Sequence, residues 1–182
     1  MLSHDQVFLY NNIGRYIYRE RVIEIAMTKI KFERIADIYQ CAYVGDWSEM
    51  EPIVANDPDS VLIRLTGSGD TALHVAAAAG NTTFVEELTK LMKPKEQLIP
   101  NSDGMLAVHL AALSRHHRIV KHFCSGQYFF GRNSYPLLDE MGYKDRKKLF
   151  FMTIDNDMFG KCIYKTSLFT PSSYLIIFYL LN

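Results

Sequence analysis

The 182-residue sequence predicts an all-α solenoid, in which about three to four pairs of helices stack on one another. Three observations predict this class. The segment 69–81 has the composition of a short helix with its own start and stop signals, the same segment recurs further along the chain, and an apolar helical stripe follows each copy. Since one helix pair cannot bury its apolar face alone, such repeats are stable only when they stack.

The segment 69–81 begins and ends as a helix should. Thr71 is a suitable N-cap, because its hydroxyl can accept a hydrogen bond from an unpaired backbone N–H group. The alanines that follow Leu73 and His74 favour helix and leave little side-chain bulk. Gly80 can adopt the left-handed conformation that ends a helix. A second helix is expected next, and its apolar stripe consists of Phe84, Val85, Leu88 and Leu91.

The same pattern returns at a constant spacing. His109 follows His74 by 35 residues, and the apolar residues of the helix after it recur at the same interval. Gly45 precedes Gly80 by 35 residues, so a degenerate first copy is expected before the central one. In the third copy Leu106 stands where threonine is expected, which removes one capping hydroxyl.

Changes in composition divide the chain into five parts. We predict an N-terminal extension with a capping helix at 1–37, repeats 1 to 3 at 38–124, an irregular connection at 125–148, an incomplete fourth repeat at 149–159 and an apolar tail at 160–182. Two alternatives to the capping helix are a basic amphipathic membrane anchor and a disordered segment. Pro52 should bend or shorten the second helix of the first repeat. An exposed tail would favour self-association.

Charge and cysteine content narrow the function classes. Basic and acidic residues number twenty each, so the balance favours neither nucleic acid nor an anionic membrane surface. Three widely spaced cysteines argue against a disulfide framework and favour a reducing compartment. The sequence lacks a secretory signal, and no run reaches the roughly 20 apolar residues of a membrane span. We therefore expect a cytoplasmic protein without a nucleic-acid partner.

The histidines invite a catalytic or metal-binding interpretation, which their spacing does not favour. His74 and His109 each stand near the start of a helix, where a ring can join neighbouring loops, so we expect both to be structural. The one cluster of metal-ligand residue types consists of His109, His116, His117, His122 and Cys124. Zinc sites use paired ligands at tight spacings, which this cluster lacks. We expect no metal, no cofactor, no small-molecule substrate and no catalytic residue.

Two loops rich in turn residues precede the second and third repeats, at 63–69 and 98–104. We predict that they form short β-turn fingers that project from the stack and contact another protein. The finger residues expected to be exposed and to bind are Arg64, Thr66, Ser68 and Asp70 in one, and Asn101, Ser102, Asp103 and Met105 in the next. The residues expected to maintain the repeat are Thr71, Leu73, His74, Gly80 and His109.

The segment 71–77 resembles the ankyrin repeat, whose signature is T-P-L-H-x-A-A, with Ala72 in place of the proline. Ankyrin repeats recur at a period of about 33 residues, close to the spacing seen here. The resemblance implies an ankyrin-repeat α-solenoid and a non-catalytic protein–protein interaction module that acts as an adaptor or scaffold.

Residues from about Tyr39 to Phe159 are also similar to the N-terminal repeats of a plant family of ankyrin membrane proteins, typified by the accelerated-cell-death type. That family carries a C-terminal PGG domain with several transmembrane helices. The similar stretches are Gly45–Trp47, Gly69–His74, Asp103–His109 and Leu149–Asp155. Because the membrane portion is missing here, the resemblance implies a truncated product, a fragment or an incomplete gene model. The alternative function is a truncated signalling or defence protein at the cytoplasmic side of a membrane, and the third class is an enzyme.

Overall fold

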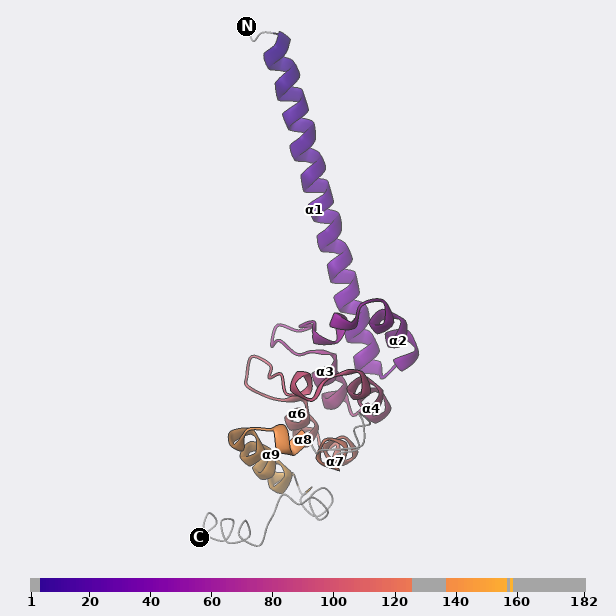
Figure 1. The fold of residues 1–182 in the computed structure, drawn as a ribbon, viewed down its shortest axis with the longest axis vertical. Helices are drawn as coiled ribbons and strands as arrows, with labels where there is room; N and C mark the ends of the chain where they lie inside the picture. Colours follow the sequence, from indigo (N-terminus) through magenta and orange to yellow (C-terminus); the bar gives the residue numbers. More distant parts are fainter. Residues whose placement is uncertain (1–3, 126–136, 157, 159–182) are drawn as a thin grey trace. The chain divides into compact units, whose positions relative to one another are not determined.

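A computed structural model describes residues 4–125, 137–156 and 158 (Figure 1). The described part is helical and contains no strand, so the predicted all-α class is confirmed. The chain divides into two compact units, residues 1–37 and 38–182. The elements in chain order are α1 His4–Val44, α2 Trp47–Asn56, the 3-10 helix η1 Pro58–Leu62, α3 Ala72–Ala79, α4 Thr82–Leu91, α5 Pro94–Gln97, α6 Ala107–Leu113, α7 His117–Ser125, α8 Leu137–Glu140 and α9 Tyr143–Asp155.

The first unit consists of the greater part of α1. The helix expected within the N-terminal extension runs from His4 to Val44, and no proline interrupts it. Apolar side chains remain exposed along it, among them Ile25, Met27 and Phe32, each at least 65% exposed. The capping role of this helix stays a prediction.

The second unit contains the stack of helix pairs. Its first pair consists of the last turns of α1, from Ile38 onward, and α2. The pairs α3–α4 and α6–α7 follow, and α9 comes after them. The inner helices α3, α6 and α9 pack in one row, and the outer helices α2, α4 and α7 pack in another (Figure 1). This arrangement is the two-layered stack that the recurring pattern predicted.

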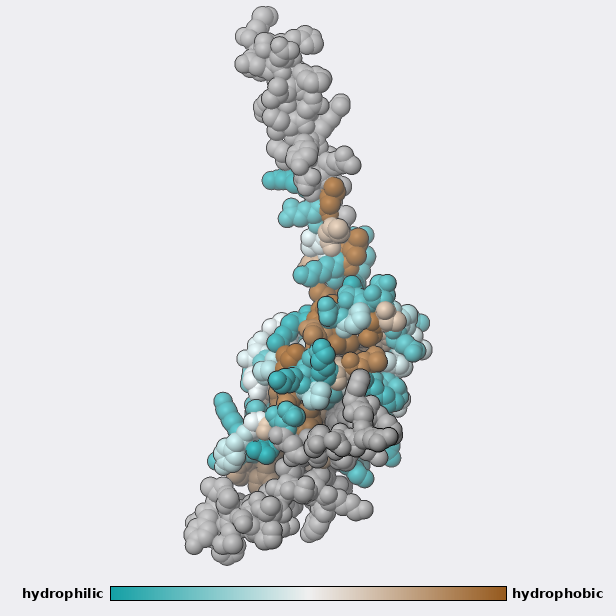
Figure 2. Space-filling view, in the orientation of Figure 1, coloured by the Kyte–Doolittle hydropathy of each residue, from teal (hydrophilic) through white to brown (hydrophobic). Residues whose placement is uncertain are grey.

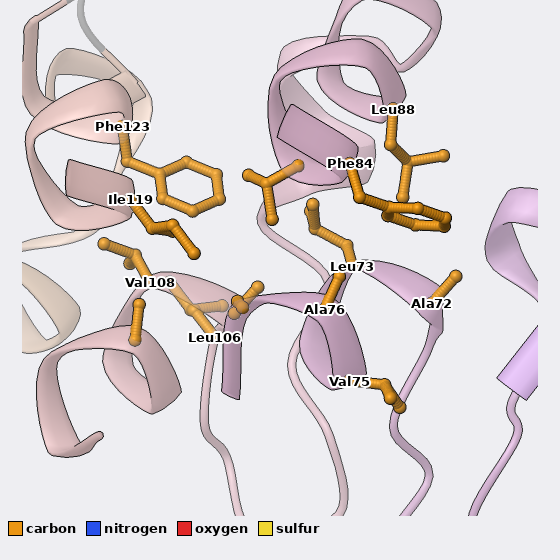
Figure 3. Packing of buried hydrophobic residues seen from close by; sticks show 14 of the residues in the cluster. Ala72, Leu73, Val75, Ala76, Phe84, Leu88, Leu106, Val108, Ile119 and Phe123 are labelled. Carbon is orange, nitrogen blue, oxygen red and sulfur yellow. The ribbon is translucent and has the colours of Figure 1, made fainter. Parts of the chain in front are cut away.

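The core lies between the two rows of helices. Figure 3 shows Leu73 beside Phe84 in one repeat and Val108 near Ile119 in the next, and all four are at most 1% exposed. Alanines are fully buried at equivalent positions of two inner helices, Ala76 and Ala77 in α3 and Ala111 and Ala112 in α6. Small residues at these positions let α3 and α6 approach closely and exclude water from the contact.

Two local predictions concern the outer helices. The first was that Pro52 bends or shortens α2, and the helix does not end there, since it continues for four residues beyond Pro52. Pro52 is exposed, and it lacks the backbone N–H that would donate within the helix, but the rest of the helix is retained. The second concerns Leu91, which is 54% exposed, although it was assigned to the apolar stripe of α4. Thr89 takes the buried place, because its hydroxyl can donate to the backbone oxygen of Val85 at 2.8 Å.

The connection to the fourth repeat is more helical than predicted. Residues 143–148 were expected to be irregular, but α9 already begins at Tyr143. Gly142 is its N-cap, and Asp145 in the first turn interacts favourably with the helix dipole. Within the same connection, Leu137–Glu140 forms the short helix α8.

Some sequence-based predictions fall outside the described residues. These are the irregular connection over 126–136, the end of the fourth repeat after 158 and the apolar tail at 160–182. Among the helices of the described part, none combines the length and the apolar character that crossing a membrane requires.

Candidate functional site

Two loops project from the start of the second and third repeats: finger 1, residues 63–70, and finger 2, residues 98–105. The two fingers are bonded to each other. The Ser102 backbone N–H donates to the Ser68 backbone oxygen at 2.8 Å. Arg64 Nη1 donates to one backbone oxygen in each finger, at 2.6 and 2.8 Å. The fingers therefore form one surface rather than two independent loops.

A partly buried polar network supports this surface. The Asp70 carboxylate accepts one hydrogen bond from the Thr66 hydroxyl and another from Asn101 Nδ2, both at 2.8 Å. Asn101 Oδ1 in turn accepts the backbone N–H of Met105 at 2.9 Å. These bonds satisfy both ends of the Asn101 amide, which is why its burial is tolerated.

The network corrects part of the predicted binding site. Asn101 and Met105 were expected to be exposed, but they are only 8% and 9% exposed. Thr66 and Asp70 are half-buried, and their side chains bond to each other. The predicted finger residues that remain exposed are Arg64, Ser68, Ser102 and Asp103.

His74 joins the second repeat to the third. Its Nδ1 accepts the Thr71 backbone N–H at 3.3 Å and lies 2.9 Å from the Thr71 hydroxyl. Its Nε2 lies 3.1 Å from the backbone oxygen of Met105. Thr71 is the N-cap of α3, as predicted, and its hydroxyl also contacts the imidazole ring.

His109 makes the equivalent link one repeat later. Its Nδ1 accepts the Leu106 backbone N–H at 3.1 Å, and its Nε2 lies 2.9 Å from the Asp145 backbone oxygen. The missing threonine at Leu106 removes a hydroxyl, but the histidine still satisfies the backbone donor. The hydrogen bond to Asp145 reaches α9 and thereby joins the fourth repeat to the third.

Both imidazole rings are neutral, and both nitrogens of each ring take part in these hydrogen bonds. Because Nδ1 accepts a backbone N–H, we assign the ring proton to Nε2, which donates it to a carbonyl. Burial lowers the pKa of His74 and of His109, and this effect outweighs the opposing effect of the carbonyl bond. Neither ring has a nitrogen left to act as a base or a metal ligand.

Sequence reasoning missed a second set of links between repeats. Asn81 Nδ2 donates to the Tyr43 backbone oxygen at 2.9 Å, and His116 Nε2 lies 3.1 Å from the Ala78 backbone oxygen. The two side chains are 35 residues apart, as are the two carbonyls that they reach. His116 lies over Gly80, where a Cβ atom would come within 2.5 Å of its ring. The sequence feature that could have predicted these links is a polar residue, Asn81 or His116, at the same repeat position shortly after the inner helix ends.

The candidate metal ligands do not converge. His109 and His116 bond to the backbone of different repeats, and His122 Nε2 lies 2.9 Å from the Thr89 hydroxyl. Over the described ranges, no three or more His, Cys, Asp or Glu side chains are grouped so that they could hold a metal ion.

Comparison with known proteins agrees with this geometry. The family model for ankyrin repeats, described as three copies, matches residues 39–131, which is just over half of the chain. The chain belongs to the ankyrin-repeat family. A search of curated proteins found no significant match. The ankyrin resemblance inferred from the sequence is therefore confirmed.

The inner helices of these ankyrin repeats carry exposed apolar residues at one repeat position. Tyr43 and Leu113 are 58% and 49% exposed, and the exposed Ala78 stands at the equivalent position between them. The Tyr43 ring stacks on Tyr39, with centroids 5.9 Å apart. Figure 2 shows hydrophobic residues among hydrophilic ones on the visible face of the second unit, residues 38–182, where it is coloured. Tyr43, Ala78 and Leu113 are called the inner row below.

Proposed function

We propose that this ankyrin-repeat chain is a non-catalytic adaptor or scaffold that binds another protein through the inner row and the exposed finger residues. The observation that carries the proposal is the exposure of Tyr43 and Leu113 at equivalent positions of the inner helices. Exposed aromatic and aliphatic groups beside polar ones are typical of protein interfaces, where an apolar centre is surrounded by a polar rim.

The polar part of this surface comes from the fingers. Arg64, Ser68, Ser102 and Asp103 are exposed, and hydrogen bonds fix the loops that carry them. A surface that is ordered before binding loses less conformational freedom when a partner docks. No cofactor is required for this function, and a cytoplasmic location suits it.

The proposal is tested by affinity capture of a partner from a plant extract with the full chain. The double variant Tyr43→Ala/Leu113→Ala removes the apolar side chains of the inner row and should abolish capture. The matched control is Leu91→Ala, which removes an equally exposed apolar side chain from the outer helix α4. If both variants capture the same proteins as the unmodified chain does, the inner row is not the binding surface.

A second function is favoured by the stretches Gly45–Trp47 and Leu149–Asp155, which are similar to the plant ankyrin family with a PGG domain. In that case the chain is the repeat portion of a membrane-associated signalling or defence protein, located at the cytoplasmic side of a membrane. Sequencing of full-length transcripts tests this proposal. Transcripts that continue into several apolar segments would support it, and transcripts that all end at Asn182 would contradict it.

A further inference from the structure

Charge is distributed unevenly along the repeats, although the chain as a whole is neutral. Between Arg34 and Arg64 the sequence has six acidic residues and no basic one. Between Asp103 and Asp139 it has four basic residues and no acidic one. The first repeat is therefore acidic and the third repeat is basic.

The outer helices display this difference at equivalent positions. One position of the outer helix holds Glu51 in α2, Glu86 in α4 and Lys121 in α7, each 35 residues from the next. Three residues before Lys121, Arg118 is also exposed on α7, and two residues before Glu51, Glu49 is also exposed on α2. Within the described residues, Glu51, Arg118 and Lys121 form no ion pair. Their charges are directed to solvent and are available to a partner.

α4 packs against both α2 and α7, so the acidic and basic helices lie on either side of it (Figure 1). A second copy that is turned by a two-fold axis running along α4 brings its α2 opposite α7 of the first copy. The same rotation brings its α7 opposite α2. Each charged surface then meets its opposite, and the contact occurs twice, as in any isologous dimer.

We propose that the outer face, defined by α2, α4 and α7, is a self-association surface that pairs two copies of this chain with their repeats in opposite order. Glu49 and Glu51 of one copy face Arg118 and Lys121 of the other, and the reverse contact forms by symmetry. A neutral chain carries no net repulsion between copies. An anionic membrane would attract α7 but repel α2, so a second copy suits the whole face better.

Dependence on salt gives the first test. Exposed ion pairs weaken as ionic strength rises, because the screening length shrinks from about 14 Å at roughly 0.05 M to about 4 Å at roughly 0.5 M salt. Sedimentation velocity of the full chain should show dimers at the lower concentration and monomers at the higher one. A monomer at both concentrations overturns the proposal. Association that is unchanged or stronger at high salt also overturns it, because apolar contacts then hold the copies together.

Charge reversal gives the second test. Arg118→Glu/Lys121→Glu makes both ends of the outer face acidic, and Glu49→Lys/Glu51→Lys makes both ends basic. Each variant alone should be monomeric at low salt, whereas an equimolar mixture should form heterodimers. The control Lys144→Glu/Arg146→Glu makes the same change in net charge as Arg118→Glu/Lys121→Glu, but on the inner helix α9, and should leave the dimer intact.

Circular dichroism checks that each variant is folded. If one reversal prevents folding, Arg118→Gln/Lys121→Gln replaces it and should also dissociate the dimer. A mixture of the two reversed variants that remains monomeric overturns the proposal. The protein-binding function is tested on the inner row, so failure of that proposal leaves these measurements unaffected.

Discussion

Gly80 is the position at which a single added methyl group should be most damaging. α3 ends there with φ at +85°, in the left-handed region. A Cβ atom would lie 2.5 Å from Cε1 of His116. Gly80→Ala therefore has two separate costs: a left-handed backbone for a residue with a side chain, and displacement of the ring that bonds to Ala78.

The size of the effect follows from these two terms. The left-handed conformation costs alanine about 1–2 kcal/mol, and the lost hydrogen bond contributes about 0.5–1.5 kcal/mol. Together they lower the free energy of unfolding by about 1.5–3.5 kcal/mol, a large share of the about 5–15 kcal/mol that stabilises a typical domain. Two other glycines allow the backbone strain to be measured apart from the collision with His116. Gly104 has φ at +65° but open space around it, and Gly67 has open space and no positive φ.

Urea unfolding followed by circular dichroism should rank the three variants. Gly104→Ala should lose about 1 kcal/mol from backbone strain alone, and Gly67→Ala should be unchanged or slightly more stable. The double variant Gly80→Ala/His116→Ala should lose less than the sum of the two single changes, because removing the ring also removes the collision. If Gly80→Ala is no more harmful than Gly104→Ala, the contact with His116 does not exist in solution.

The remaining predictions concern packing, backbone strain, metal and pH. Leu73 is 1% exposed, so Leu73→Ala should cost about 2–5 kcal/mol, and an unchanged urea midpoint would mean that the repeat assignment is wrong. Arg115 has φ at +62°, so Arg115→Gly should raise the urea midpoint by relieving about 1 kcal/mol of strain, and a lowered midpoint would count against this. EDTA should leave the melting temperature unchanged, whereas unfolding that zinc reverses would reveal a metal site. The pKa of His74 and of His109 is lowered from 6.5, so the unfolded chain binds more protons than the folded one in acid. The free energy of unfolding should therefore be constant above about pH 6.5. Below that pH it should fall by up to about 1.4 kcal/mol per pH unit for each ring. A urea midpoint that does not move on acidification contradicts the assigned neutral state.

Local signals in the sequence were enough to predict the fold. Thr71 and Gly80 mark the two ends of α3, and the buried position of Leu73 follows from the apolar pattern. The 35-residue spacing between His74 and His109 then identified the stack. These features depend on neighbours within a few residues, or on a period that can be counted.

The exposure of the finger residues could not be predicted in the same way. Asn101 is a typical turn residue, and turns are usually exposed. It is buried because Asp70, 31 residues earlier, accepts a hydrogen bond from its amide. The links from Asn81 and His116 were missed for the same reason, since each side chain bonds to a carbonyl 38 residues earlier. Such contacts appear only when two repeats are placed against each other.

The links between repeats and the proposed binding surface use different parts of each repeat. The links end on backbone oxygens, which every residue type supplies, so the neighbouring side chains are free to vary. Tyr43 and Ala78 show this separation, because each supplies a backbone oxygen to a link and directs its side chain to solvent. A change of side chain in the inner row can therefore alter the partner while the link beneath it is kept. Stability and recognition are then set by separate atoms of the same residue, which explains how one repeat scaffold can serve different partners.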